Sequence, residues 1–147
     1  DAIGPYIVPQ ARAAGFDGYL VGADGWDGTL GTMVDDKSLY NNTFFTNHYA
    51  ADDPSEKVQN FIKAYGEMFD PKTLNALGAL AYDATYMLAK AIDDAGSDDT
   101  EAIIKAMTGM SFEGVTGSFK LDETNTPAKS VSIIEFKDGK AVWNSTI

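Results

Sequence analysis

The chain has no cysteine among its 147 residues and only one histidine. The lack of cysteine excludes disulfides, thiolate metal sites and cysteine nucleophiles, and it fits either a cytoplasmic protein or an exported one without disulfides. His48 could act as a base or a ligand, but a lone histidine at a strand end more often satisfies a local hydrogen bond. The sequence also lacks His-Glu-x-x-His, P-loop and Gly-x-Ser-x-Gly motifs, so most local signatures of catalysis are missing.

Basic residues are scarce: 11 Lys and Arg stand against 22 Asp and Glu, which gives a formal net charge of -11 and a pI near 4.3. Nucleic acids and anionic membranes both require a basic surface, so this balance argues against them. A neutral or cationic partner is favoured. Most of the acids are expected in loops and near helix ends, as solvated or capping groups.

No apolar run approaches the roughly 20 residues that a membrane-spanning helix needs. Residues 1–5 have neither the basic start nor the apolar core of an export signal, so we expect any signal or anchor to have been removed. Hydrophobic residues make up 44% of the chain, which is enough for the core of an ordinary domain of this length.

Helical and extended patterns alternate in the first part of the chain. An apolar stripe predicts a helix over 2–14 that stops at Gly15, and the apolar run 19–21 predicts a strand. A weak short helix over 29–34 and a strand over 43–49 are expected next. This alternation indicates an α/β fold.

The next helix has a strong predicted start. Asp53 is the expected N-cap, with Pro54 at the first helical position and Glu56 closing a capping box. The apolar stripe that follows keeps helical spacing up to about Phe69.

The longest helical pattern covers 77–92 and should stop near Gly96; a shorter helix is expected over 100–107. The pattern then changes to period two, which predicts strands. These cover 117–121, 131–136 and 141–143. Asp138-Gly139 predicts a tight hairpin between the last two, and the loop 122–127 is the best candidate for a hinge or a crossing between subdomains.

The stretch from Gly22 to Gly28 follows the apolar run 19–21, and in α/β folds ligands bind beyond such strand ends. Its residues suit a small cation. Glycines allow a close backbone approach, Asp24 supplies a carboxylate, and Trp26 supplies a ring that can cover an amine or an apolar tail. The alternative is an ordinary Asp-Gly turn with Trp26 in the core.

Two further roles for Asp24 and Asp27 are poorly supported. A pair of carboxylates could hydrolyse glycosides, or could begin a calcium loop. A calcium loop needs further oxygens at alternate positions and a late glutamate, and Trp26 and Gly28 interrupt that series. Tyr82, near the start of the helix over 77–92, either reaches into a cleft or is a half-buried surface residue.

Three segments taken in order closely resemble the branched-chain amino-acid-binding family, the extracellular substrate-binding proteins of ABC importers. They are Gly22–Asp27, Phe44–Tyr49 with Asp53-Pro54, and Asn75–Ala84. The ending Phe119–Asp122 and the Asp138-Gly139 hairpin add to the likeness, which covers essentially the whole chain.

The resemblance implies a type I periplasmic-binding-protein fold, in which two α/β lobes close over an amino acid. It places crossings between the lobes near 43–52 and 115–128. Members of this family bind and deliver their ligand without catalysis, and the resemblance implies neither a cofactor nor a metal. It also implies an extracytoplasmic location and the membrane subunits of an ABC transporter as partners.

The family's binding residues carry over by position. Asp24 falls where an acid commonly receives the α-ammonium of the ligand, and Tyr82 falls where an aromatic residue often lines the cleft. Trp26 and Gly25 lie next to the acid. Tyr49 and Asp27 are weaker candidates.

Members of the family are considerably longer, and residues 1–147 resemble only their C-terminal portion. The upstream portion would hold the carboxylate of the ligand, so this chain alone should bind amino acids weakly or not at all. The helices over 58–69 and 77–92 would lack strands to pack on, and exposed apolar faces of that kind drive pairing. We therefore expect the missing N-terminal portion, a swapped second copy or a rearranged fold.

Two other classes of function stay open at this point. The same fold serves as the ligand-sensing domain of receptors and regulators, and a genomic neighbour or an N-terminal lipobox would separate this alternative from transport. An enzyme is the third hypothesis, and turnover of an amino-acid amide would revive it.

Overall fold

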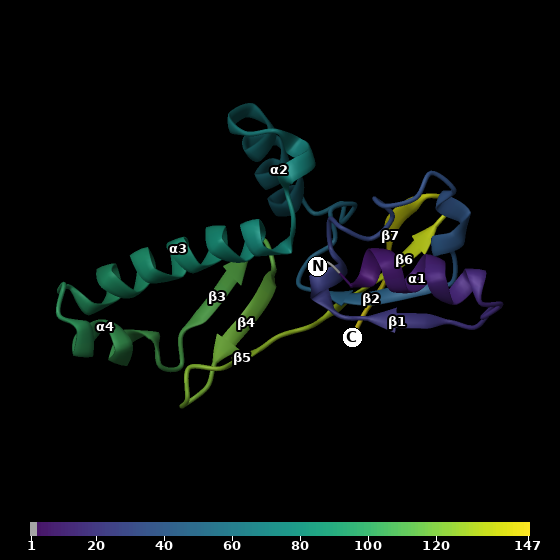
Figure 1. The fold of residues 1–147 in the computed structure, drawn as a ribbon. Coiled ribbons are helices and arrows are strands. Elements are labelled where there is room, and N and C mark those ends of the chain that lie inside the picture. The colour runs from purple at the N-terminus through teal and green to yellow at the C-terminus, as the bar shows by residue number, and fades with distance from the viewer. Residues whose placement is uncertain (1–2) are drawn as a thin grey trace. The chain divides into compact units, whose positions relative to one another are not determined.

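The computed structural model describes residues 3–147 (Figure 1). The chain divides into two units. The first contains the residues up to 76 together with 131–147, and the second contains 77–130. The crossings expected near 43–52 and 115–128 therefore lie inside the first and the second unit, and their role in a longer protein stays a prediction.

The first unit is built on a four-stranded mixed sheet in the order β1-β2-β6-β7. Its strands are β1 (Leu20–Gly22), β2 (Thr43–Asn47), β6 (Ser132–Lys137) and β7 (Lys140–Thr146). Strand β2 runs parallel to β1 and antiparallel to β6. Because Gly22 pairs with Phe45, the carboxyl ends of β1 and β2 lie at the same edge of the sheet. Residues that follow these two strands are thereby brought together.

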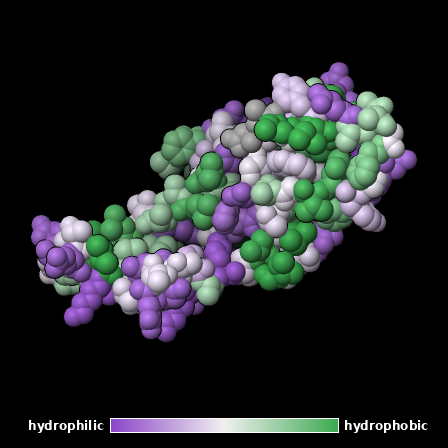
Figure 2. Space-filling model, turned by 60° about the horizontal axis from the view of Figure 1, so that its bottom comes forward, coloured by the Kyte–Doolittle hydropathy of each residue, from purple (hydrophilic) through white to green (hydrophobic). Residues whose placement is uncertain are grey.

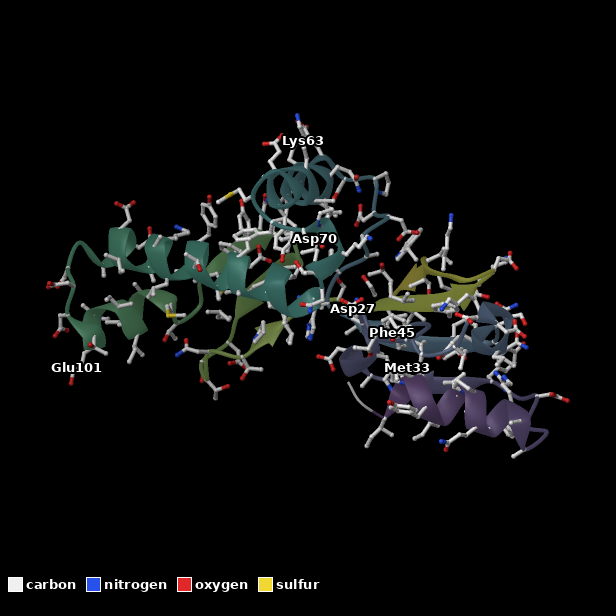
Figure 3. The ribbon with its side chains drawn as sticks, turned by 45° about the horizontal axis from the view of Figure 1, so that its top comes forward. Asp27, Met33, Phe45, Lys63, Asp70 and Glu101 are labelled. Carbon is white, nitrogen blue, oxygen red and sulfur yellow. The ribbon has the colours of Figure 1, made fainter. Side chains whose placement is uncertain are left out.

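Helices complete the first unit. They are α1 (Gly4–Ala13), α2 (Glu56–Met68) and the short 3-10 turns η1 (Asp24–Trp26), η2 (Lys37–Tyr40) and η3 (Pro71–Thr73). Apolar side chains of α1, η2, the sheet and two connecting segments form one core, made of Val8, Leu30, Tyr40, Phe45, Ala50, Ile134 and Phe136. Figure 3 shows Phe45 within the first unit, whereas Lys63 of α2 points outward.

The second unit packs a three-stranded antiparallel sheet, β3-β4-β5, with two helices. Its elements are α3 (Ala76–Ala95, whose first residue belongs to the first unit), α4 (Thr100–Met107), β3 (Ser111–Gly114), β4 (Gly117–Leu121) and β5 (Pro127–Ala128). Ala91, Met110 and Leu121 form its buried centre.

Several predictions from the sequence are confirmed. Helix α3 ends where Gly96 adopts a left-handed φ of 58°, which a residue without Cβ takes at little cost. At the hairpin, Asp138 and Gly139 both have positive φ, 50° and 84°, as a two-residue turn between twisted strands requires. Helices α1 and α4 also form where they were predicted.

The short helix expected over 29–34 is wrong, because this segment is a series of turns. Gly28 and Gly31 have φ of 71° and 83°, values that no right-handed helix contains. Gly31 also lies against the ring of Phe136, and a Cβ at this position would meet that ring. The segment is therefore shaped by a close backbone approach to the core.

The N-cap of α2 is Ser55 instead of Asp53. The Ser55 hydroxyl accepts a bond from the N–H of Val58 at 3.5 Å. The Asp53 carboxylate lies before the helix and accepts the N–H of Ser55 at 2.8 Å. An aspartate side chain that accepts the backbone N–H two residues later in the chain closes an Asx turn. This turn precedes the helix, so the N-cap lies two residues later than predicted.

One further boundary differs from the prediction, and one strand was missed. The strand over 43–49 ends at Asn47. The loop 122–127 lies inside the second unit and is closed by the Asp122 carboxylate, which accepts the N–H groups of Thr124 and Thr126 at 2.8 and 2.9 Å. It is an ordered turn that connects β4 to β5, and its role as a hinge or a crossing in a longer protein stays a prediction. Strand β3, which pairs with β4 as a hairpin, was not predicted.

Large hydrophobic side chains reach the surface of both units (Figure 2). On α3, three of them lie on one side of the helix, because they are eleven and four residues apart. They are Leu77, Leu88 and Ile92, which are 65%, 49% and 41% exposed. Within residues 3–147, no helix is both long and apolar enough to cross a membrane.

Candidate functional site

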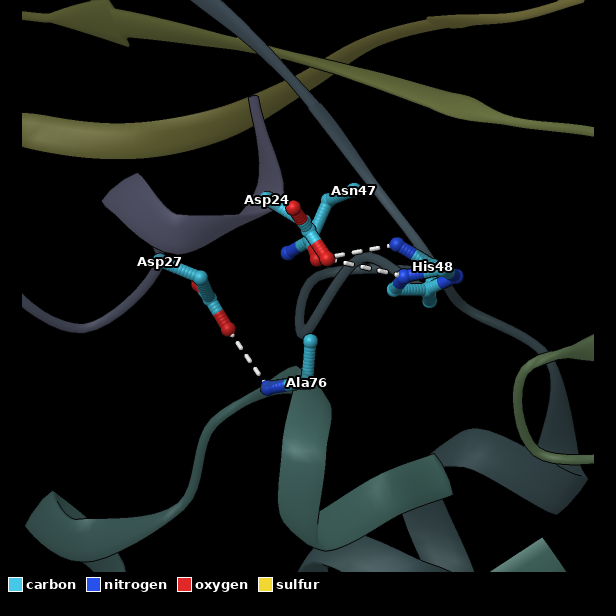
Figure 4. A network of polar contacts seen from close by, with 5 residues as sticks. All are labelled: Asp24, Asp27, Asn47, His48 and Ala76. Carbon is cyan, nitrogen blue, oxygen red and sulfur yellow. Dashed lines mark hydrogen bonds and ion pairs between the residues drawn. The ribbon is translucent and has the colours of Figure 1, made fainter. Parts of the chain in front are cut away.

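Asp24 begins the turn η1, immediately after the loop that leaves β1. Its side chain is 48% exposed, and its Oδ2 lies 3.1 Å from Nε2 of His48. Figure 4 shows the two side chains facing each other. The carboxylate is thus held at the carboxyl edge of the sheet, but about half of its surface is open to solvent.

His48 follows directly after β2, so the parallel pairing of β1 and β2 brings it to the same edge as Asp24. Its backbone N–H donates to Oδ1 of Asn47 at 2.8 Å, a local bond. The imidazole, in contrast, contacts a residue 24 positions away. The sequence favoured the local bond over a role as a base or a ligand, and gave no sign of the contact with Asp24.

Asp27 lies in a different environment from Asp24. Its Oδ2 accepts the N–H of Ala76, the first residue of α3, at 2.6 Å, and it also bonds the buried side chain of Asn47. Burial raises the pKa of Asp27, with a smaller contribution from the charge of Asp24, while the bonds from Ala76, Asn47 and Gly28 oppose the rise. Asp27 therefore satisfies an otherwise unpaired donor at the start of a helix.

Trp26 is half buried and packs against the core of the first unit. Its indole lies against the backbones of Gly4 and Gly22, where a Cβ on either glycine would overlap the ring. The Trp26 side chain, which was predicted to cover a ligand, thus fills the space between α1 and β1. Gly25, in the same turn, leaves its carbonyl at the exposed surface, 3.5 Å from Oγ1 of Thr29.

Tyr49, the residue after His48, is only 6% exposed. Burial raises its pKa to about 12, with further contributions from the charges of Asp27 and Tyr65. Its phenol therefore stays neutral at any physiological pH.

Tyr82 belongs to α3, in the second unit. It is 40% exposed, and its ring centroid lies 4.8 Å from that of Tyr86. A hydrogen bond with Tyr86, followed by burial, raises its pKa. Five of the six candidates thus share the first unit, while Tyr82 packs in a tyrosine pair of the second.

Asp83 is a buried acid to which the sequence analysis gave no role. Its carboxylate accepts the N–H groups of Val115 and Thr116, both at 2.8 Å, and the Thr116 hydroxyl at 2.7 Å. Gly114 approaches this carboxylate so closely that a Cβ there would overlap it. The only signal in the sequence is an acid among small apolar residues of a helix, followed 31 residues later by a glycine.

The second unit also contains a cavity of about 300 Å³ lined mainly by apolar side chains of α3, α4 and β4. Lys129 reaches its wall, and its Nζ is buried without a hydrogen-bond partner. Burial lowers the pKa of Lys129, while the charge of Asp83 opposes the shift. Over residues 3–147, no group of three or more His, Asp and Glu side chains could hold a metal ion.

The sequence profile of a family described as periplasmic binding protein matches residues 4–141. The chain belongs to this family. The type I periplasmic-binding-protein fold and the likeness to the branched-chain amino-acid-binding proteins, both expected from the sequence, are confirmed.

Solved structures of this family superpose well on the chain. The leucine binding protein LivK of Thermotoga maritima is 33% identical, with a TM-score of 0.83 over 96% of this chain and 40% of its own. The branched-chain amino acid transporter substrate binding protein LivJ of Streptococcus pneumoniae, solved with isoleucine, is 26% identical, with a TM-score of 0.77 over 97% of this chain and 40% of its own. The chain thus spans about 40% of the length of these structures.

Other relatives differ in what they bind. A solute binding protein of Rhodopseudomonas palustris, solved with 3,4-dihydroxybenzoic acid, is 23% identical with a TM-score of 0.76 over 98% of this chain and 42% of its own, and it shares the fold. Glutamate receptor 2.4 of Arabidopsis thaliana is 26% identical over 110 residues, which cover 60% of this chain and 12% of that protein. Proteins of this fold therefore bind ligands as different as isoleucine and 3,4-dihydroxybenzoic acid.

Proposed function

We propose that this chain is the C-terminal portion of an extracytoplasmic substrate-binding protein that delivers amino acids of the branched-chain type to an ABC importer. The observation that carries the proposal is Asp24, a half-exposed carboxylate at the carboxyl ends of two parallel strands. The matches to LivK and to LivJ with isoleucine support the ligand class.

Asp24 is the residue that would receive the α-ammonium of the amino acid. A charge-assisted hydrogen bond of this kind contributes about 1.5–3 kcal/mol. Gly25 allows the backbone to approach the ligand, and Trp26 holds the turn against the core. The half-buried Asp27 and the buried Tyr49 act behind Asp24, because Asp27 is bonded to Ala76 and Tyr49 is covered. Direct ligand contact by Tyr82 stays a prediction.

The partners follow from the same proposal. They are the membrane subunits of the transporter and, for the fold itself, either the N-terminal portion of a longer protein or a swapped second copy. The exposed side of α3, with Leu77 at 65% and Leu88 at 49% exposure, favours such a partner because contiguous apolar surface is unfavourable in water.

A ligand-sensing domain is the alternative, and the match to a plant glutamate receptor favours it. Sensing and transport predict the same binding chemistry at Asp24. They differ in what the longer protein contains, so a transporter operon beside the gene would support import, whereas a fused signalling domain would support sensing.

Calorimetric titration tests the binding proposal. L-leucine and L-isoleucine are titrated into the chain, alone and together with the upstream portion of its gene product, and into the Asp24→Asn variant of each. Loss of the charge should weaken binding about tenfold or more. Asp94→Asn is the matched control, because Asp94 is an exposed acid that pairs with Lys90 on the outside of α3. Unchanged affinity in Asp24→Asn would show that Asp24 is only a turn residue.

Light scattering on the same samples tests the partner. A dimer, or a chain that binds only after the upstream portion is added, would support the incomplete site. A stable monomer that binds leucine unaided would show that the site is complete within these 147 residues.

A further inference from the structure

The imidazole of His48 and the amino group of the proposed ligand would meet the same carboxylate. Nε2 of His48 lies 3.1 Å from Oδ2 of Asp24, and the two side chains are 36% and 48% exposed. Both groups are therefore reachable by solvent and by a small molecule. Figure 4 shows the contact between His48 and the Asp24 carboxylate.

The effect of His48 on this carboxylate depends on its charge. A neutral imidazole donates one hydrogen bond and leaves the negative charge of Asp24 in place. An imidazolium forms an ion pair, which neutralises that charge and repels a second cation nearby. Imidazoles change between these forms in the range from about pH 5 to pH 8.

We propose that His48 is a further residue of the Asp24 site and makes the binding of an amino group dependent on pH. This inference rests on the proposed function. At neutral pH the carboxylate of Asp24 attracts the ligand ammonium, and in mild acid the protonated His48 competes with it. The competition requires no displacement of the histidine, because two cations at one carboxylate repel each other wherever they bind.

Other titratable groups around the pair have different effects. Asp27 is coupled to Asp24 through their charges, and burial raises the pKa of Asp27, so its protonation in acid would also reduce the attraction for an ammonium. Tyr49 has a pKa of about 12 and does not titrate in this range. Asn47, which bonds Asp27 and the backbone N–H of His48, carries no charge. Asp27 is thus the competing source of pH dependence.

Two variants at position 48 and one at position 27 separate these sources. L-leucine is titrated calorimetrically at about pH 7.5 and about pH 5.5, and the wild type should bind about tenfold more weakly at the lower pH. His48→Gln, which is neutral at both values, should bind with similar affinity at both. His48→Arg, which is charged at both, should bind weakly at both. Asp27→Asn is the matched control and should keep the pH dependence of the wild type.

The histidine also offers a readout that needs no ligand. Since the chain contains one histidine, its imidazole gives a single set of NMR resonances. Asp24→Asn should move these resonances in the free protein, and leucine should move them in the wild type.

The outcomes are distinct. Equal leucine affinity at both pH values in the wild type, or a pH dependence that persists in His48→Gln, overturns the role of His48 and leaves the proposed function intact. Loss of the pH dependence in Asp27→Asn would then identify Asp27 as its source. No leucine or isoleucine binding by any form at either pH, with or without the upstream portion, overturns the proposed function and this inference with it.

Discussion

Asp24 and Asp83 both lie beside a glycine-containing turn, but their surroundings are opposite. Asp83 is 3% exposed, and its carboxylate accepts three hydrogen bonds from Val115 and Thr116. Asp24 is 48% exposed, and its side chain contacts His48. In the second unit the turn encloses the acid, whereas in the first unit the turn presents the acid to solvent.

This difference separates a structural carboxylate from one that is available to a ligand. A carboxylate has about four acceptor positions, and at Asp83 the protein occupies most of them with its own donors. At Asp24 most positions are open. The two roles should therefore separate in experiment: changes around Asp83 should affect stability, and changes at Asp24 should affect binding.

The largest effect is expected for Asp83→Asn. The amide keeps one acceptor oxygen but turns a donor toward the backbone N–H groups of the 115–116 turn, so buried donors lose their partner. The free energy of unfolding should fall by about 3 kcal/mol, as measured by urea denaturation. Asp94→Asn, which removes only an exposed ion pair with Lys90, should change it by about 0.5 kcal/mol or less. Equal effects of the two variants would contradict the structural role of Asp83.

Gly114→Ala should come next, because its Cβ would overlap the Asp83 carboxylate. Forcing that contact should cost about 1–3 kcal/mol of stability. Gly66→Ala is the matched control: Gly66 is exposed on α2, and its Cβ would meet only Pro71, at 3.7 Å. That variant should be more stable than the wild type by about 0.5–1 kcal/mol. A neutral Gly114→Ala would mean that the turn can move away from the acid.

A smaller effect, visible mainly as a pH dependence, is expected at Asp27. Its folded-state pKa is raised above 3.8, so the folded state binds the proton more tightly than the unfolded chain. The stability that this group contributes is complete below 3.8 and is lost as the pH rises through the raised pKa. The Asp27→Asn variant removes this pH-dependent loss of stability, and its amide oxygen can still accept the backbone N–H of Ala76.

Denaturation of the wild type and Asp27→Asn across the acid range measures the difference. The variant should gain stability relative to the wild type as the pH increases. A variant that loses stability relative to the wild type as the pH increases would show that the hydrogen bonds from Ala76 and Asn47 outweigh the effect of burial on the pKa of Asp27.

The smallest effect on stability is expected for Asp24→Asn. The pair with His48 is half exposed, and pairs of this kind contribute about 0–1 kcal/mol. The melting temperature of the variant should match that of the wild type, while its affinity for leucine falls. A large loss of stability would place Asp24 in the same class as Asp83.

Much of the fold could be predicted because local signals decide it. The stripe of α3 and its glycine stop, and the Asp138-Gly139 turn, act over a few residues. The helix expected over 29–34 is wrong because a distant contact overrides the local pattern. Gly31 takes a left-handed conformation beside Phe136, a partner more than a hundred residues away, and the apolar spacing over 29–34 contains no sign of it.

The candidate site was predicted in part for the same reason. A strand that ends in Gly-Ala-Asp-Gly points to Asp24 without any knowledge of the fold. The parallel pairing of β1 with β2, which brings His48 to Asp24, depends on the sheet order. The hydrogen bond from the N–H of Ala76 to Asp27 joins residues 49 positions apart, so it could not be predicted from the sequence either.

The indole of Trp26, which packs against Gly4 and Gly22, is an intrinsic fluorophore close to the candidate site. It follows Asp24 by two residues, and the other tryptophan, Trp143, lies on β7 and is 48% exposed. Emission from a half-buried indole and from a solvated one differs in wavelength. If the proposed ligand binds at Asp24, the emission of Trp26 should shift, and this shift can be followed without an attached dye.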